Sequence, residues 1–369
     1  MESREEAETR PCRGGASMNG SVEAPAGSGG VSAKFAIDVG RLGKWMMSNV
    51  QGFPGHLTVE KFSGGQSNPT YKVCTENRDY VLRRKPPGVL FKGAHAIDRE
   101  VRVLTSLEAT GFPVPRVHGY CADESVIGTP FYVMDMVEGR IFWNASLPEV
   151  PRADRPAYFE AMNRTIAQLH AIDPDGIGLS DFGRGGNYFE RQIARWSRQY
   201  LDDADAGRHP DMDRLLEWLP AHIPAGEETA IIHGDFRIDN MIFHPDEPRV
   251  VAVLDWELST LGHPLADFTY NAMMYRVPPD IVAGLAGIDL AALNIPSEDE
   301  YVAAYCRNSG RSEIPHYQFY MVFNLFRLAA IFHGIKGRSI RGNAASPESA
   351  QRAASFPVLA SLAWQEARG

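Results

Sequence analysis

The run Ile231-Ile232-His233-Gly234-Asp235-Phe236-Arg237-Ile238-Asp239-Asn240-Met241-Ile242-Phe243 places a polar loop between two short apolar segments. A further apolar run, Val250–Leu254, follows it and ends at Asp255. Short apolar runs bounded by polar residues are typical of buried strands. Strand ends and the loops between them hold side chains rigidly, which suits groups that need a fixed geometry. The pattern therefore predicts that Asp235, Asn240 and Asp255 carry the chemistry of this chain.

These three residue types match the needs of phosphoryl transfer. One carboxylate must orient the attacking hydroxyl and accept its proton, while an Asn oxygen and a second carboxylate hold Mg²⁺ on the nucleotide phosphates. Asp235 and Asn240 have the D-x-x-x-x-N spacing of kinase catalytic loops. Asp and Asn also cap turns, which is the alternative for this pair taken alone. The arrival of Asp255 at the end of a following apolar run favours the kinase interpretation.

Upstream residues supply the remaining parts of a kinase. Ser63–Tyr71 is rich in small residues, which let backbone N–H groups approach phosphates, although a plain hairpin turn explains it equally well. Arg83 ends the apolar run Tyr80–Leu82, where kinases carry a phosphate-binding lysine. Glu100, on the helix expected at 96–109, is its natural partner, and a mere surface pair is the alternative.

At this point the chain resembles the aminoglycoside phosphotransferase and choline kinase superfamily of small-molecule kinases over about residues 55–345. Within that superfamily it resembles the kinase-like domains of acyl-CoA dehydrogenase family members ten and eleven and their stand-alone bacterial relatives. The motifs that carry the resemblance are His233-Gly234-Asp235 to Asn240, Leu254-Asp255-Trp256-Glu257, Ser63–Tyr71, Tyr80–Pro86, Phe326–Ile331 and Gly334–Arg338.

The resemblance implies an α+β, bilobal protein-kinase-like fold that uses ATP and Mg²⁺. Its β-rich N-lobe contains one main helix, and its C-lobe is larger and helical. Asp235 corresponds to the catalytic base, and Asn240 and Asp255 to the Mg²⁺ ligands. The residues that it implies for nucleotide binding are Gly64, Gly65, Gln66, Ser67, Asn68, Arg83, Glu100 and, through backbone groups of the interlobe linker, Asp135 and Val137. Many relatives have Lys in place of Arg83, and because Arg is larger, phosphate binding could be altered.

The pattern along the chain divides it into three parts. Residues 1–33 combine many small residues with no aromatic side chain and are expected to be a disordered tail. Residues 34–137 read as strands (57–62, 71–74, 80–83 and 131–136) around one helix and form the expected nucleotide-binding N-lobe. Residues 138–369 read as long amphipathic helices and form the expected C-lobe with the catalytic loop, metal site and acceptor site.

Several polar residues have two possible roles. Asp267 is expected either to brace the catalytic loop or to cap a helix, and His233 to form structural hydrogen bonds. Arg191 and Arg195 share a helix face beside Trp196, where they could meet an anionic substrate or pair with Glu190 or Asp202 in solvent. The segment 301–345 has six basic residues and one acidic residue, Glu313, which favours an acidic or phosphorylated acceptor. The six are Arg307, Arg311, Arg327, Lys336, Arg338 and Arg341.

Composition limits the remaining possibilities. A net charge of −9 gives no general attraction to nucleic acid or to an anionic membrane. The apolar run 319–335 contains Asn324, Arg327 and His333, so a buried helix is expected rather than a membrane span. Four widely spaced cysteines and the absence of a signal-like N-terminus favour a cytoplasmic location without a zinc site.

The sequence thus predicts a kinase for a hydroxyl group of a small metabolite. The acceptor expected first is acidic or CoA-linked, for example a hydroxyacyl-CoA or a hydroxy acid. An aminoglycoside-type antibiotic kinase and a catalytically silent nucleotide-binding protein are the alternatives. Acyl-CoA dehydrogenase activity is not expected, because the kinase-like region leaves no space for a flavin domain. The sequence does not indicate the oligomeric state.

Overall fold

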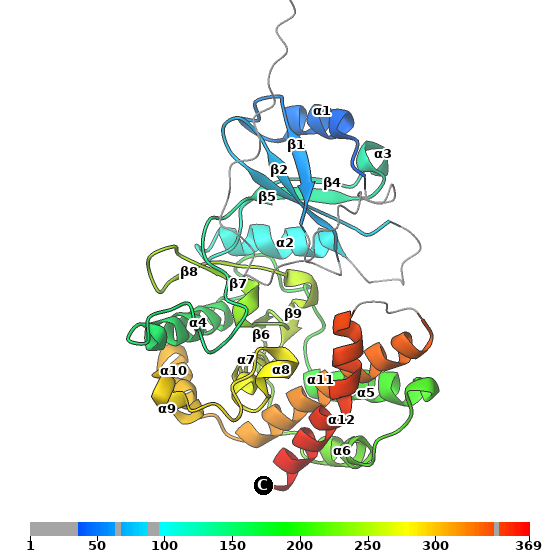
Figure 1. Cartoon of the computed structure of the whole chain (residues 1–369), viewed down its shortest axis with the longest axis vertical. Helices are drawn as coiled ribbons and strands as arrows, with labels where there is room; N and C mark the ends of the chain where they lie inside the picture. Colours follow the sequence, from blue (N-terminus) through cyan, green and yellow to red (C-terminus); the bar gives the residue numbers. More distant parts are fainter. Residues whose placement is uncertain (1–35, 63–67, 88–95, 343–346) are drawn as a thin grey trace, which may run out of the picture. The chain divides into compact units, whose positions relative to one another are not determined.

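The computed structural model describes residues 36–62, 68–87, 96–342 and 347–369 (Figure 1). The expected tail, residues 1–33, and the nucleotide-binding candidates Gly64, Gly65, Gln66 and Ser67 lie outside these residues. The chain folds into two units. The first contains the described residues up to Arg140 together with Ile242–Pro245 and Val251–Glu257, and the second contains Ile141–Met241, Asp246–Val250 and Leu258–Gly369. The sequence placed a single boundary after residue 137, whereas two later segments return to the first unit.

A five-stranded sheet in the order β1-β2-β3-β5-β4 organises the first unit. All its neighbouring strands are antiparallel, and β4, which the sequence did not predict, pairs with β5 at one edge. The strands are β1 (Thr58–Lys61), β2 (Thr70–Cys74), β3 (Tyr80–Arg84), β4 (Val117–Cys121) and β5 (Phe131–Asp135). In the register of β3 and β5, Arg83 lies opposite Tyr132.

Three helices accompany this sheet: α1 (Val39–Asn49), α2 (Ile97–Glu108) and the short α3 (Glu124–Ile127). The sequence predicted α2 and missed α1, whose N-cap Asp38 accepts a hydrogen bond from the backbone N–H of Arg41. Leu42 and Met46 of α1 are fully buried in an apolar core with side chains from β2, β3 and β5. That burial stabilises α1 beyond its own helix propensity.

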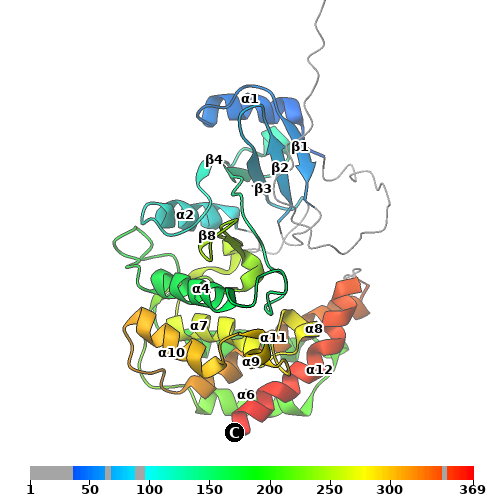
Figure 2. The same cartoon turned by 60° about the vertical axis from the view of Figure 1, so that its left-hand side comes forward.

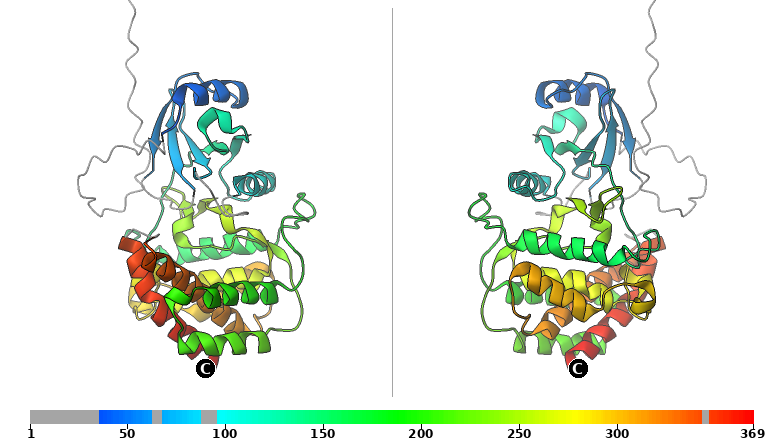
Figure 3. Two further views of the ribbon diagram at one scale, coloured as in Figure 1. Left: turned by 90° about the vertical axis from the view of Figure 1, so that its right-hand side faces the viewer. Right: turned by 90° about the vertical axis from the view of Figure 1, so that its left-hand side faces the viewer.

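The second unit is mostly helical, as the sequence predicted. Its helices are α4 (Arg155–His170), α5 (Tyr188–Asp202), α6 (Pro210–Ala221), α7 (Pro264–Ala272), α8 (Pro279–Val282), α9 (Leu290–Leu293), α10 (Glu298–Ser309), α11 (Tyr317–Ile340) and α12 (Pro347–Arg368). Helix α4 packs against α10 (Figure 2), and α11 packs against α12 (Figure 3). These contacts bury the apolar faces that the helical periodicity predicted.

Helix α11 is buried along most of its length, including Asn324, Arg327 and His333. Asn324 donates hydrogen bonds to the Ala266 carbonyl and the Thr269 hydroxyl, each at 2.8 Å. A helix that is apolar on nearly all sides belongs in a protein interior, so the predicted buried helix is confirmed. Among the residues that the structure describes, no helix is long and apolar enough to cross a membrane.

Short strands hold the loop that carries the sequence motif. Strand β6 (Ala230–Ile232) pairs antiparallel with β9 (Thr260–Gly262), and β7 (Met241–Phe243) pairs with β8 (Val250–Val253). The loop 233–240 connects β6 to β7 and ends in the 3-10 turn η3 (Ile238–Asn240). All three residues of β6 and all three of β7 are buried. The loop is therefore anchored at both ends by buried strands.

Candidate active site

Asp267, at the start of α7, holds the beginning of the candidate catalytic loop, residues 233–240. Its two carboxylate oxygens accept hydrogen bonds from the backbone N–H groups of His233 and Gly234, each at 2.8 Å. Burial alone would raise the pKa of Asp267, but the hydrogen bonds from His170 and from the His233 backbone lower it. The N-cap of α7 is His263. Of the two roles predicted for Asp267, the structure therefore confirms that it braces the loop, and it shows that Asp267 is not the N-cap of α7.

The carboxylate of Asp235 is held by three side chains. The Tyr270 hydroxyl donates to its Oδ1 at 2.7 Å, and the Asn240 Nδ2 donates to its Oδ2 at 3.0 Å. The Arg237 Nε lies 3.3 Å from Oδ1. The Asp235 side chain remains 23% exposed, which leaves it accessible to a substrate. A carboxylate that is oriented and partly open suits a residue that must accept a proton from a positioned hydroxyl.

The amide of Asn240 has a defined orientation. Its Nδ2 donates to the backbone carbonyl of Asp235 at 2.9 Å as well as to the carboxylate. Since both neighbouring atoms are acceptors, the amide nitrogen must face them, and the amide oxygen then points elsewhere. That oxygen accepts no hydrogen bond from any described residue. An available amide oxygen is a suitable ligand for Mg²⁺.

The conformation of the loop at Gly234 depends on glycine and on a contact from Arg327. Gly234 has φ 84°, and a Cβ atom at this position would lie 2.8 Å from the Leu258 carbonyl oxygen, so only glycine fits. The guanidinium of Arg327, on α11, donates to the Gly234 carbonyl at 2.6 Å. The sequence did not predict a role at the loop for Tyr270, Arg237 or Arg327. Tyr270 and Arg327 lie far from the loop along the chain, and the spacing of Asp235 and Asn240 says nothing about Arg237 between them.

In the first unit, Arg83 and Glu100 form the predicted ion pair. The Arg83 Nε lies 2.9 Å from the Glu100 Oε2, and both side chains are largely buried. Asn68 and Tyr132 donate hydrogen bonds to the two Glu100 oxygens, at 2.8 and 3.0 Å. Burial raises the pKa of Glu100, an effect that Arg83 opposes. Asn68, a nucleotide-binding candidate, thus orients Glu100 in this structure.

Arg83 also contacts the predicted metal ligand. Its Nη2 lies 2.5 Å from Asp255 Oδ1 and 3.7 Å from Glu257 Oε2. Burial would lower the pKa of Arg83, but the carboxylates of Glu100, Asp255 and Glu257 outweigh it and raise that pKa. One arginine therefore joins helix α2 to the segment after β8. The guanidinium is well placed to meet negative charge near Asp255.

Asp255 has an uncommon backbone conformation. Its φ is 65°, in the left-handed region that residues with a side chain rarely adopt. The next residue, Trp256, is buried and donates from its indole N–H to the Val253 carbonyl at 2.9 Å, which closes a tight turn. Backbone strain of this kind is concentrated at functional sites. The carboxylate, 34% exposed, can supply an oxygen ligand to Mg²⁺.

The linker after β5 offers backbone groups to a nucleotide base. The N–H of Asp135 donates to the Arg116 carbonyl at 2.9 Å, so a base could use Asp135 only through its carbonyl. The Asp135 side chain is paired with Arg78 and His118. Neither backbone group of Val137 has a hydrogen-bond partner among the described residues. This pattern is compatible with the predicted contacts of both residues to adenine.

The basic residues of segment 301–345 are mostly engaged in structural contacts. Arg311 pairs with Glu228, Arg341 pairs with Asp203, and Lys336 donates to the Ala206 carbonyl at 2.7 Å. These three basic side chains already have partners within the protein, so they do not form a free basic surface for an acidic acceptor.

Arg191 and Arg195 of α5 do not form the ion pairs that were expected in solvent. Arg191 donates to the backbone carbonyls of Gly185 and Arg184, and the Arg195 guanidinium lies 4.9 Å from the centre of the Trp196 ring. Neither forms an ion pair with a described residue, so the predicted pairing with Glu190 or Asp202 is wrong. The local backbone and an aromatic ring provide the contacts that carboxylates were expected to provide.

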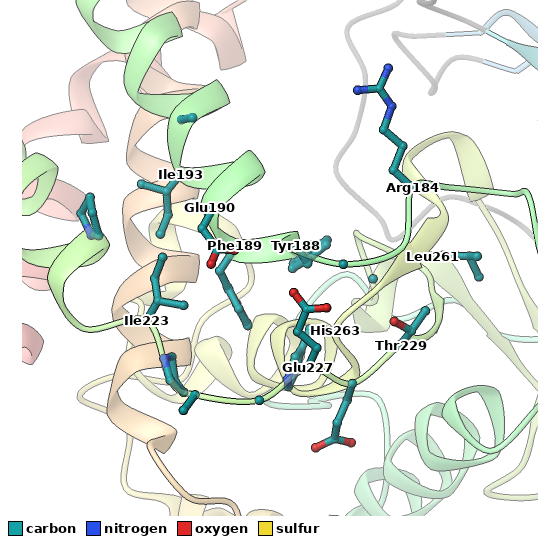
Figure 4. A pocket seen from close by; sticks show the side chains of 18 of the residues that line it. Arg184, Tyr188, Phe189, Glu190, Ile193, Ile223, Glu227, Thr229, Leu261 and His263 are labelled. Carbon is teal, nitrogen blue, oxygen red and sulfur yellow. The ribbon is translucent and has the colours of Figure 1, made fainter.

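A cavity of about 810 Å³ lies in the second unit, between α5, the C-terminal part of α6 and the segment 223–229 (Figure 4). Phe189, Ile193 and Ile223 contribute apolar walls, and Glu190 and Glu227 contribute carboxylates. Neither Asp235 nor Asn240 lines it. This cavity is therefore lined by residues other than Asp235 and Asn240 of the candidate catalytic loop.

Comparison with known proteins identifies the family. The model of the phosphotransferase enzyme family matches residues 58–320, which include Asp235, Asn240 and Asp255 as well as Arg83 and Glu100. The chain belongs to this family. The assignment is consistent with two features of the structure: Asp235 and Asn240 contact each other within one loop, and Arg83 forms an ion pair with Glu100. The superfamily resemblance seen in the sequence is thereby confirmed.

Curated relatives of this phosphotransferase include two longer proteins. Acyl-CoA dehydrogenase family member 10 of Mus musculus is 43% identical over 312 residues, which are 84% of this chain and 29% of the relative. Acyl-CoA dehydrogenase family member 11 of Gallus gallus is 44% identical over 346 residues, 90% of this chain and 44% of the relative. The chain thus spans less than half the length of these relatives.

Solved structures support the same fold. A Ralstonia eutropha protein described as a candidate aminoglycoside phosphotransferase has 45% identity and a TM-score of 0.83, over 90% of this chain and 99% of that one. A microcompartment-associated aminopropanol kinase has 18% identity and a TM-score of 0.56, over 89% and 96% of the two chains. The predicted α+β kinase-like fold is confirmed, and this member of the phosphotransferase family is kinase-like.

Proposed function

We propose that this phosphotransferase transfers a phosphoryl group from ATP to a hydroxyl group of a small metabolite, and that the acceptor is a hydroxyacyl-CoA or a hydroxy acid. The observation that carries the proposal is the fixed carboxylate of Asp235. Tyr270 and Asn240 hold it while part of it stays exposed. A carboxylate in this state can orient an alcohol and accept its proton.

The reaction follows from the roles of the side chains. The acceptor oxygen forms a bond to the γ-phosphorus as the bond to the ADP oxygen breaks, and Asp235 accepts the hydroxyl proton. Asn240 and Asp255 would hold Mg²⁺, which when bound neutralises charge on the nucleotide phosphates. Arg83, oriented by Glu100, would bind phosphate oxygens. Backbone groups of Asp135 and Val137 would hold the adenine.

The proposed acceptor class rests on two supports. The curated relatives are named acyl-CoA dehydrogenases, which work on acyl-CoA compounds, and this chain matches a part of them. In addition, Arg327 lies beside the catalytic loop, where a cationic acceptor would be repelled. An aminoglycoside, as a polycation, fits this surrounding less well than an acid or thioester. The cytoplasm, which contains ATP and Mg²⁺, is the location we propose.

A turnover assay tests the proposal. Mg²⁺-dependent ADP release would be measured for the wild type and for Asp235→Ala, with a panel of hydroxyacyl-CoAs, hydroxy acids and aminoglycosides. We expect release that is stimulated by an acyl acceptor and lost in the variant. Stimulation by aminoglycosides alone would overturn the acceptor class. Nucleotide binding without turnover on any acceptor would favour a catalytically silent nucleotide-binding protein.

A further inference from the structure

Helices α5 and α11 pack along a mostly apolar seam that contains one arginine. Phe323 and Arg327 are four residues apart on α11 and therefore share a face. From α5, the ring of Tyr188 lies 6.3 Å from that of Phe323, and Gln199 donates to the α11 backbone at 3.2 Å. Between these two contacts, the Arg327 guanidinium carbon lies 5.9 Å from the centre of the Trp196 ring. A charge thus lies where the seam would otherwise be closed by apolar side chains.

This arginine is buried without a negative partner. Arg327 is 8% exposed and forms no ion pair with any described residue. Its acceptor within the described residues is the Gly234 carbonyl, at 2.6 Å. A guanidinium has five N–H donors, so most of its donor capacity is unused. Because a buried unpaired charge is costly, its presence indicates an anionic or strongly polar partner that arrives with a ligand.

The indole of Trp196 is a second donor without a partner. Trp196 is 9% exposed, and its buried Nε1 has no hydrogen-bond partner in the part of the chain that the structure describes. Buried N–H groups in native proteins are nearly always paired. The Trp196 ring also carries the guanidinium of Arg195, at 4.9 Å from the ring centre. The seam therefore contains a buried indole N–H without a partner among the described residues, with two guanidinium groups near the same ring.

The surroundings of Tyr188 contain several of these charges. Burial raises the pKa of Tyr188 to about 12; Arg327, Arg191 and Arg195 act to lower that pKa, and Asp267 acts to raise it. Three arginines from two helices, together with Asp267, are therefore within electrostatic reach of one partly buried hydroxyl.

The donor cluster also lies beside the catalytic carboxylate. Tyr270 donates its hydroxyl to Asp235, and its ring centre lies 4.9 Å from the Arg327 guanidinium carbon. The Gly234 carbonyl that Arg327 contacts belongs to the peptide bond preceding Asp235. A ligand that meets Arg327 is thus within a few atoms of the base.

We propose that Arg327 and the indole N–H of Trp196 bind the acyl oxygen of the acceptor, and so place its hydroxyl group at Asp235. The acyl oxygen belongs either to the carboxylate of a hydroxy acid or to the carbonyl of a hydroxyacyl thioester. This inference rests on the proposed function, because it takes Asp235 as the site of phosphoryl transfer. A planar guanidinium with a neighbouring N–H donor matches the two lone pairs of such an oxygen.

Binding without nucleotide tests the inference independently of turnover. Calorimetric titrations would use 4-hydroxybutyrate, 4-hydroxybutyryl-CoA, free coenzyme A and 1,4-butanediol. We expect Arg327→Met to weaken binding of the acid or of the thioester by roughly 10-fold or more, with no change for coenzyme A. An effect on the acid alone identifies the carboxylate as the bound group, and an effect on the thioester alone identifies the carbonyl.

Matched variants separate binding from folding. Trp196→Phe keeps the aromatic packing and removes one donor, so roughly 3- to 10-fold weaker acyl binding is expected. Arg327→Lys keeps the charge and should retain part of the affinity. Arg338→Met, at an exposed position further along α11, should leave binding unchanged. If Arg327→Met does not fold, the titration of Trp196→Phe still shows whether acyl binding depends on this pair of donors.

Two results would overturn the inference. One is that the wild type binds neither acyl compound, and the other is that the Arg327 and Trp196 variants bind them as the wild type does. If the wild type nevertheless transfers phosphate, the proposed function stands without this subsite. If acyl binding depends on Arg327 but no phosphate is transferred, the subsite stands and the proposed function fails.

Discussion

Replacement of Tyr270 by Phe is the sharpest test of how Asp235, the proposed catalytic base, is held. The hydroxyl donates to Asp235 Oδ1 at 2.7 Å, whereas the ring is buried and packs beside Arg327. The substitution keeps the ring and removes one hydrogen bond. Burial and the nearby Asp235 charge raise the pKa of Tyr270, so the hydroxyl is a neutral donor near pH 7.

The size of the effect follows from the type of bond that is lost. A hydrogen bond to a charged group contributes about 1.5–3 kcal/mol. Asn240 and Arg237 still contact Asp235 in the variant, so the carboxylate is loosened rather than released. At about 1.4 kcal/mol per factor of ten, kcat should fall roughly 10- to 100-fold. The KM for ATP should not change, because the Tyr270 hydroxyl contacts Asp235 and none of the described residues that are predicted to bind the nucleotide.

The assay is steady-state phosphoryl transfer with the acceptor that the panel identifies. Tyr275→Phe is the matched control, since its buried hydroxyl has no hydrogen-bond partner within the described residues. That control should keep its kcat within about twofold of the wild type, because no hydrogen bond is lost. An unchanged kcat in Tyr270→Phe, or an equal loss in both variants, would refute the argument that this hydroxyl positions Asp235.

Three further predictions follow from buried groups. Glu100→Gln leaves Arg83 without its closest buried partner, so urea unfolding should show a loss of about 3 kcal/mol, and the KM for ATP should rise; equal stability of variant and wild type would contradict this. Asp267→Asn replaces one of two acceptors of backbone N–H groups with a donor, so a loss of about 2–4 kcal/mol together with lower kcat is expected, and normal kcat would show that the loop needs no such brace. Burial lowers the pKa of His263 to about 4, so the unfolded chain binds more protons than the folded one between about pH 6.5 and 4. Stability should therefore fall by up to about 3 kcal/mol as the pH drops through that window, and His263→Asn, which can still cap α7, should lose less in pH-dependent unfolding; an equal loss would assign the effect to other groups.

The sequence was most informative where the site is local. Asp235 and Asn240 lie in one loop, so their spacing alone predicted that they act together, and the structure has them hydrogen-bonded. Arg83 and Glu100 were paired correctly because a strand followed by a helix brings their positions together. The buried character of α11 followed from its composition. Helix α1 was missed, since its apolar positions acquire meaning only against the sheet that covers them.

Charge pairing was the weakest part of the sequence analysis. Six basic residues in one segment suggested an acidic acceptor, but Arg311 and Arg341 have carboxylate partners far away in the chain. Arg327, which looked like any other member of that segment, is the one that lies beside the catalytic loop. A count of charged residues does not predict these partners, because the two residues of an ion pair can lie at any separation along the chain.

The amino-acid sequence by itself determined the α+β class and the family and predicted the residues of the candidate catalytic loop, because these depend on short-range patterns of apolar and polar residues. Tertiary structure alone showed that Tyr270 and Arg327 hold this loop. Tyr270 is 35 positions from Asp235, and Arg327 is 93 positions from Gly234. Such contacts form only when helices α7 and α11 pack against the loop, since packing brings distant segments within hydrogen-bonding distance.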